Sequence, residues 1–211
     1  MRRPFLILCF VITSFYSFGQ SVRFGIKAGL NLSDQTINSL GMPVKSSNIS
    51  GFHAGAIFDF EIANISIQPG VFYSQKGYQY NQALSDGSQT VQKPIVGKIQ
   101  LNYLEVPLNL VYKIKIIPDL RFYLGGGGYA GYGLSGSYIL SGQRTDVYFT
   151  KSIQGYQYKN PDYGVNFIAG VEILKKIVVD ANYSLGLNDL SYYPASTIKN
   201  KSIGVSVGYL F

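Results

Sequence analysis

The chain has 211 residues, of which 46% are hydrophobic and only 14% are charged, and it carries 24 Gly and 18 Tyr. Soluble domains average about 25% charged residues and about 7% Gly, so this chain is short of charge and rich in Gly. The composition excludes a disordered chain, a collagen-like chain and a disulfide scaffold. After residue 20 no apolar run reaches the roughly 18 residues that a spanning helix needs, which excludes a helical membrane protein.

The first residues have the pattern of a secretory signal peptide. Arg2 and Arg3 precede an apolar run, and Ser17-Phe18-Gly19 places small residues at the spacing that a signal peptidase recognises. The pattern predicts a signal peptide over residues 1–19 and a mature domain over residues 20–211. Because the one Cys of the chain lies inside the predicted signal peptide, the mature protein is expected to form no disulfide.

Beyond residue 20 apolar residues alternate with small or polar ones, which is the period of a β-strand. In the first segment Val22, Phe24 and Ile26 alternate with Arg23, Gly25 and Lys27, and the last segment repeats the pattern. The alternation predicts eight strands, at residues 22–33, 51–62, 65–78, 98–113, 120–135, 163–173, 177–185 and 202–211.

The connections between these strands alternate strictly between long and short. Short turns and long loops on opposite sides are typical of an up-and-down barrel in an outer membrane. The sequence therefore predicts an all-β fold, a closed antiparallel transmembrane β-barrel of eight strands with both termini in the periplasm. A strand at Thr145–Lys151 in the longest loop leaves ten strands as a minor alternative.

The apolar face of each strand is expected to face lipid, because the other face is too rich in Gly for a solvated surface. This orientation also sorts the aromatic residues into two interfacial belts. The predicted periplasmic belt is Phe24, Phe60, Tyr112, Phe122, Tyr209 and Phe211, and the predicted external belt is Phe52, Tyr73, Tyr103, Tyr132 and Tyr163.

Several segments resemble one family. The residues Gln68–Gly77, Tyr103–Leu108 and Gly126–Tyr132, with the terminal Gly208-Tyr209-Leu210-Phe211, look like the PorT-like outer-membrane β-barrel family. The resemblance covers the whole mature chain and implies an eight-stranded barrel in a Gram-negative outer membrane. For some members it implies a role in a dedicated protein-secretion system. The terminal aromatics Tyr209 and Phe211 also resemble the signal that barrel-assembly machinery recognises.

Two motifs invite a catalytic or cofactor-binding interpretation. Gly126, Gly128 and Gly131 fit G-x-G-x-x-G, but a dinucleotide site needs a helix directly after the motif, and the residues Tyr132–Gly136 cannot begin one. His53 is the only histidine, and it alternates with Phe52 so as to point into the lumen near the outer rim. We expect a hydrogen-bonded lumen histidine, and no catalytic, cofactor-binding or metal-binding residues.

Pro69 and Pro107 interrupt segments that otherwise read as paired strands. The alternation slips by one residue near Leu104-Glu105, which predicts a β-bulge there. Beyond the bulge the lipid-facing residues are expected to be Val106, Leu108, Leu110 and Tyr112. A binding niche lined by Glu105 is a secondary interpretation.

The net charge of +7 falls to +5 once Arg2 and Arg3 are removed. No basic stripe with interleaved aromatics appears, so nucleic acid is not an expected partner. The loop cations are expected to meet lipopolysaccharide phosphates, since that leaflet is anionic. They are Lys45, Lys93, Arg144, Lys151 and Lys159.

Charged residues on the inward face are expected to pair, because an unpaired charge in a lumen is costly. The predicted network comprises Arg23, Glu61, Lys113, Arg121, Glu172 and Asp180. Within it we expect Arg121 near Glu172 and Asp180, and Arg23 near Glu61. Tyr123, Phe72 and Tyr129 are expected to fill the space above.

An eight-stranded barrel has an interior just wide enough for its side chains, which favours a structural or interaction role over a channel. The sequence therefore predicts a monomeric scaffold whose surface loops serve adhesion or protein secretion. The alternatives are a narrow porin-like channel and a lipid-modifying barrel enzyme. Expected partners are outer-membrane lipid and lipopolysaccharide, the barrel-assembly machinery, and secretion-system or surface proteins.

Overall fold

The computed structural model describes residues 21–82, 95–151 and 156–211. The predicted signal peptide and the loop residue Lys93 lie outside these ranges. Within them the regular structure is all β, and none of these residues forms a helix that could cross a membrane.

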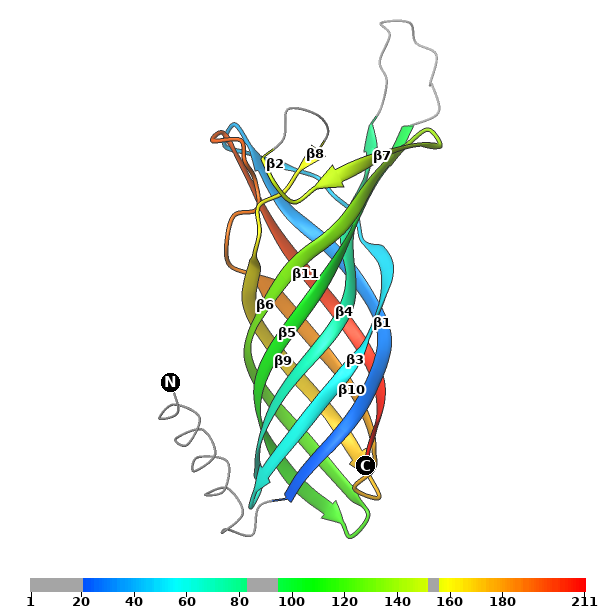
Figure 1. Ribbon diagram of the computed structural model, residues 1–211, viewed down its shortest axis with the longest axis vertical. Helices are drawn as coiled ribbons and strands as arrows, with labels where there is room; N and C mark the ends of the chain where they lie inside the picture. Colours follow the sequence, from blue (N-terminus) through cyan, green and yellow to red (C-terminus); the bar gives the residue numbers. More distant parts are fainter. Residues whose placement is uncertain (1–20, 83–94, 152–155) are drawn as a thin grey trace, which may run out of the picture.

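Eight long strands form a closed antiparallel ring, as the alternation predicted (Figure 1). Around the ring the order is β1, β3, β4, β5, β6, β9, β10 and β11, and pairing of β11 with β1 completes the circle. The strands are β1 Ser21–Ser39, β3 Ile49–Ile62, β4 Ile65–Gln82, β5 Ile95–Ile117, β6 Leu120–Leu140, β9 Asp162–Ile173, β10 Ile177–Gly186 and β11 Ser196–Leu210.

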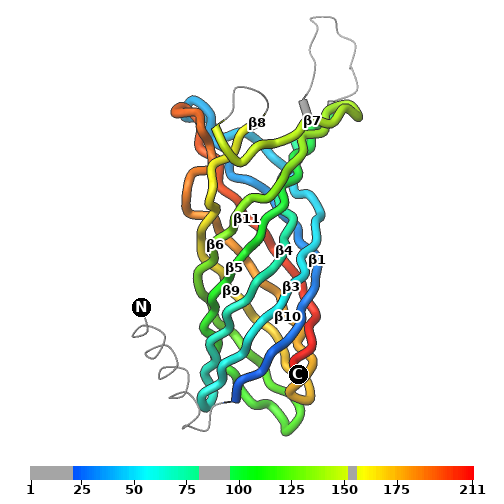
Figure 2. Tube along the Cα trace, in the orientation of Figure 1, coloured from blue at the N-terminus to red at the C-terminus, as the bar shows by residue number. Residues whose placement is uncertain are grey.

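The two ends of the barrel differ in their connections (Figure 2). One end, called here the turn end, has the tight turns that follow β3, β5 and β9, together with Ser21 and the C-terminus. The opposite loop end carries the long connections. It also holds the short strands β2 Met42–Val44, β7 Gln143–Tyr148 and β8 Tyr156–Gln157.

The ten-strand alternative is wrong. β7 folds back on the top of β6 and continues only into a parallel pairing with the two residues of β8. It extends the sheet beyond the ring, and it does not join the wall.

The wall of the barrel reverses its polarity along its height. In the lower part of β5 the outward residues from Leu104 to Tyr112 are exposed and apolar, while Lys113 points inward and is buried. Higher on the same strand Ile99, Leu101 and Tyr103 are buried inside, and Lys98 and Gln100 lie on the outer side. The lower wall thus suits lipid and the upper wall suits water.

The length of β5 supports this division. It has 23 residues, whereas a tilted strand crosses a membrane with about 9–11. The strands at the loop end therefore continue past the lipid-facing band. There they enclose an apolar core around Tyr78, Ile99, Leu101, Tyr103 and Tyr158.

The expected slip near Leu104-Glu105 is wrong, because inward and outward residues alternate through this part of β5 without a break. The irregularity lies between Asn102 and Tyr103. Asn102 pairs with Ser135 of β6 and Tyr103 pairs with Gly133, so the pairing skips Leu134. Val106, Leu108, Leu110 and Tyr112 face outward as expected. Tyr103 does not belong to the external aromatic belt, since its side chain is fully buried in the apolar core.

Candidate functional site

The lumen near the turn end contains a compact group of charged side chains, called here the lower ion cluster. Its members come from five of the eight strands of the ring and point to one place. They are Arg23 of β1, Asp59 and Glu61 of β3, Lys113 of β5, Arg121 of β6 and Glu172 of β9.

Each cation of the lower ion cluster contacts more than one carboxylate. Lys113 Nζ lies 2.7 Å from Asp59, 3.0 Å from Glu61 and 3.2 Å from Glu172. Arg121 lies 2.5 Å from Glu61 and also pairs with Glu172. Arg23 lies 3.0 Å from both Glu61 and Glu172, and pairs with Asp59. Three cations therefore balance three carboxylates across the full width of the lumen.

Asp59 belongs to this cluster although the sequence analysis did not select it. Its side chain is fully buried, and it accepts hydrogen bonds from Ser66, from Gln68 at 3.0 Å and from Lys113. The signal was present, because Asp59 lies between Phe58 and Phe60, which both face outward. The same alternation that placed Glu61 in the lumen places Asp59 there as well.

Asp59, Glu61 and Glu172 lie close enough for one oxygen of each to share a metal ion. Each of the three carboxylates is already paired with two or three of the buried cations. A divalent ion would have to displace these side chains, so the geometry fits an internal ion cluster better than a metal site.

Asp180 does not join Arg121, in contrast to the expectation from the sequence. It pairs with Lys27 at 2.6 Å and accepts a hydrogen bond from the Tyr123 hydroxyl at 2.7 Å. The other five predicted members come together. Tyr123, Phe72 and Tyr129 all lie buried in the lumen.

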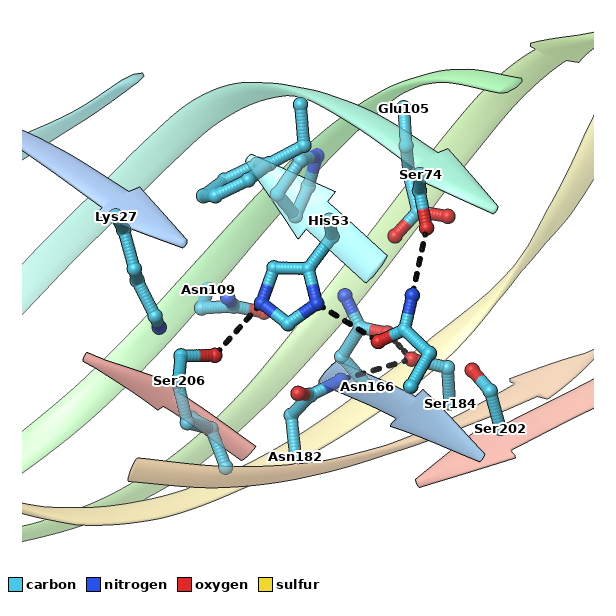
Figure 3. Close-up of a pocket in the computed structure, with 14 residues that line it drawn as sticks. Lys27, His53, Ser74, Glu105, Asn109, Asn166, Asn182, Ser184, Ser202 and Ser206 are labelled. Atoms are coloured by element: carbon cyan, nitrogen blue, oxygen red, sulfur yellow. Dashed lines mark hydrogen bonds between the residues drawn. The ribbon is translucent and has the colours of Figure 1, made fainter. Parts of the chain in front are cut away.

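Above Asp180 the lumen holds a small polar cavity (Figure 3). Its open space is about 60 Å³, which is enough for a few water molecules. Most of its lining is polar and comes from strands all around the ring. The lining includes Lys27, His53, Ser74, Glu105, Asn109, Asn166, Asn182, Ser184, Ser202 and Ser206.

His53 is held in this cavity by hydrogen bonds on both ring nitrogens. Asn31 donates to Ser74 at 3.3 Å and to the Gln75 carbonyl at 3.2 Å, which leaves its Oδ1 as an acceptor. His53 Nδ1–H then donates to that oxygen at 2.7 Å, and Nε2 accepts from Ser206 at 2.8 Å. The contact with Asn31 thus places a proton on Nδ1, and in the neutral ring Nε2 is then the acceptor.

The Ser206–His53–Asn31 chain resembles the nucleophile, base and orienting group of a hydrolase. All three residues are buried, and the cavity beside them has room only for a few waters. A lipid ester cannot reach Ser206 Oγ in this geometry. The hydrogen bonds of Ser206, His53 and Asn31 therefore hold in place the side chains that line the cavity.

A second charged group, called here the upper ion cluster, closes the top of the cavity. Lys76 Nζ lies 2.5 Å from Glu105 and 3.4 Å from Asp162, and it sits 4.2 Å from the centre of the Tyr129 ring. Asp162 also accepts a hydrogen bond from Asn200 at 2.9 Å. Glu105, the residue of the secondary niche interpretation, thus lines the cavity and joins this cluster.

The C-terminal residues lie at the turn end, on the outer surface. The Phe211 ring packs with Tyr209 at 5.1 Å and stacks on Phe24 at 5.9 Å. The Phe211 N–H donates to the Phe24 carbonyl at 2.8 Å. The terminal aromatics thus join the belt at the seam where β11 meets β1.

Comparisons with solved structures show the same architecture. The outer membrane protein OprG from Pseudomonas aeruginosa has a TM-score of 0.50 at 12% identity, covering 92% of this chain and 98% of its own. Neisserial surface protein A has a TM-score of 0.48 at 15% identity, covering 92% and 99%. At these identities the likeness concerns the fold alone. A comparison with curated proteins gave no match.

The family profile described as "Outer membrane protein beta-barrel domain" matches residues 18–192. This range contains the first seven strands of the ring. Such barrels reside in the bacterial outer membrane. The chain belongs to the outer membrane protein β-barrel domain family.

Proposed function

We propose that this protein is a non-conducting, monomeric barrel that presents its loop end at the cell surface as an interaction scaffold. The observation that carries the proposal is the closure of the lumen at successive heights. The lower ion cluster, the upper ion cluster and the apolar core of the loop end follow one another along the axis. An ion entering the lumen would have to break buried ion pairs or cross the apolar core.

Planar-bilayer recordings of the purified protein are expected to show no steady conductance. The Arg121→Ala variant is expected to leak or to lose stability, because Glu61 and Glu172 each lose a cation that contacts them. The matched control is Arg144→Ala on β7, outside the ring. Large, steady, ion-selective currents through the unmodified protein would overturn the scaffold proposal.

The narrow channel is the second candidate function, and the polar cavity favours it. The cavity already holds space for water between the two ion clusters. A continuous water path through the lumen would need the ion pairs of both clusters to separate. If conductance appears only when substitutions disrupt both clusters, the native protein is non-conducting, as the scaffold proposal requires.

The proposal places the loop end outside the cell and the termini in the periplasm. The short turns and long loops support this orientation, since it is the arrangement of outer-membrane barrels. A membrane-impermeant maleimide added to intact cells is therefore expected to label Ser141→Cys between β6 and β7. It should leave Asn64→Cys, in the turn after β3, unlabelled until the cells are lysed. Labelling in the reverse order would contradict the orientation.

Two further assignments, the role of the loop end and its partners, belong to the proposal. The resemblance to the PorT-like family supports a role as an accessory to protein secretion, and the exposed loops suit adhesion equally. The expected partners are outer-membrane lipid and lipopolysaccharide, the barrel-assembly machinery, and surface or secretion proteins. A catalytic role is not proposed, because the Ser206–His53–Asn31 chain has no room for a substrate.

A further inference from the structure

The outer wall has a groove at the height where its polarity reverses. It has a volume of about 240 Å³ and is formed by β1, β10 and β11 with Asn48. Its apolar side consists of Leu32, Tyr183 and Ile203, which are all exposed. Its polar side contains Asp34 and Lys201. The groove therefore joins the lipid-facing band to the water-facing wall.

Lys201 is positioned in this groove by a buried carboxylate. Its Nζ lies 3.0 Å from Asp34 Oδ2, and Asp34 Oδ1 accepts the backbone N–H of Gln35 at 2.8 Å. The Asp34 side chain is 10% exposed, whereas that of Lys201 is 40% exposed. The carboxylate thus restricts the lysine and leaves part of the ammonium group open to a ligand.

A second cation lies beside the first, nearer the loop end of the same strand. Lys199 is two residues from Lys201 on β11, so both side chains project from the same outer face, while Asn200 between them is buried in the lumen. Lys199 has no ion pair among the residues that the structure describes. Two lysines and one buried aspartate leave a net positive charge at the top of the apolar band.

We propose that this groove binds a phosphorylated lipid of the outer leaflet, with the phosphate at Lys199 and Lys201 and an acyl chain against Leu32, Tyr183 and Ile203. Charge complementarity and the continuity of the groove with the lipid-facing wall identify a lipid as the occupant. A soluble anion would use the lysines but not the apolar side. The inference rests on the proposed orientation, which places this height at the outer leaflet.

Native mass spectrometry of the full chain in neutral detergent tests the inference, with a bis-phosphorylated acyl-glucosamine disaccharide as the probe. Each lysine near an anionic lipid surface contributes about fivefold in affinity. The Lys199→Gln/Lys201→Gln variant is therefore expected to bind the probe at least tenfold more weakly. The dephosphorylated disaccharide should bind both proteins equally weakly. Phosphatidylglycerol distinguishes a general phospholipid site from one that needs the disaccharide.

Lys98→Gln is the matched control, since Lys98 lies on the outer side of β5, away from the groove. Lys199→Gln alone provides a variant that keeps the Asp34–Lys201 pair, and a heat-shifted gel band reports folding of each barrel. An equal loss of affinity in Lys98→Gln would overturn the inference. So would tight binding of inorganic phosphate that the lipid probe does not displace. Conductance and maleimide labelling are measured separately, so failure of the proposed function remains distinguishable.

Discussion

Replacing Lys113 with Ala is expected to produce one of the largest losses of stability in this protein. The Lys113 side chain is 1% exposed and contacts three carboxylates of the lower ion cluster. Its removal leaves three negative charges with two cations in a region that water cannot reach freely. Breaking a buried ion pair in this way costs about 3–5 kcal/mol. We expect a decrease of that size in the free energy of unfolding.

Urea titration of the barrel in lipid vesicles, followed by the mobility of the folded band on a gel, measures this loss. Lys98→Ala is the control, because it removes the same kind of side chain from the outer side of the same strand. Surface substitutions of this kind usually change stability by less than about 0.5 kcal/mol. Equal effects of the two variants would show that the buried ion pairs do not stabilise the barrel.

A second substitution separates charge imbalance from loss of packing. In the Lys113→Ala/Asp59→Asn variant two cations face two carboxylates again, while the space left by the lysine remains. We expect this double variant to recover part of the stability that Lys113→Ala loses, which is a coupling between neighbours that a double-mutant cycle measures. If the double variant is less stable by the sum of both single losses, packing alone explains the effect.

The strand pattern was predictable because each lipid-facing residue must be apolar and its neighbours must point into the lumen. This period placed Arg23, Glu61, Lys113, Arg121 and Glu172 on the inner wall. The alternation did not show which side chains Asp180 would contact. Which inward residues meet across a barrel depends on the stagger of strands around the ring, and alternation along one strand contains no information about stagger.

The upper part of the barrel was harder to predict for a different reason. The expectation that apolar residues face lipid holds only for the lower part of each strand, since Ile99, Leu101 and Tyr103 lie inside the wall. The apparent slip near Leu104 is the point where the outer environment changes from lipid to water. Lys76 and Asp162 of the upper ion cluster were missed because they lie near this boundary, on strands whose polarity pattern changes there.

Replacing Phe211 with Asp is expected to reduce insertion of the barrel several-fold without changing synthesis or export. The Phe211 ring stacks on Phe24 where β11 closes the ring against β1, and 66% of the residue is exposed. The substitution removes an aromatic anchor from the interface and adds a charge beside the lipid. The predicted recognition signal, Tyr209 with Phe211, loses its terminal residue. Quantifying the protein in isolated outer membranes, against the total made by the cell, measures the effect.

Phe58→Asp distinguishes the terminal signal from the belt. Phe58 packs on the same Phe24 ring at 5.4 Å, and its side chain is also exposed, but it lies in β3 far from the C-terminus. If the assembly machinery recognises the last strand, Phe211→Asp reduces insertion much more than Phe58→Asp. If both variants reach the membrane equally poorly, the loss of an aromatic residue from the belt is sufficient. Undiminished levels of Phe211→Asp would count against a C-terminal signal in this chain.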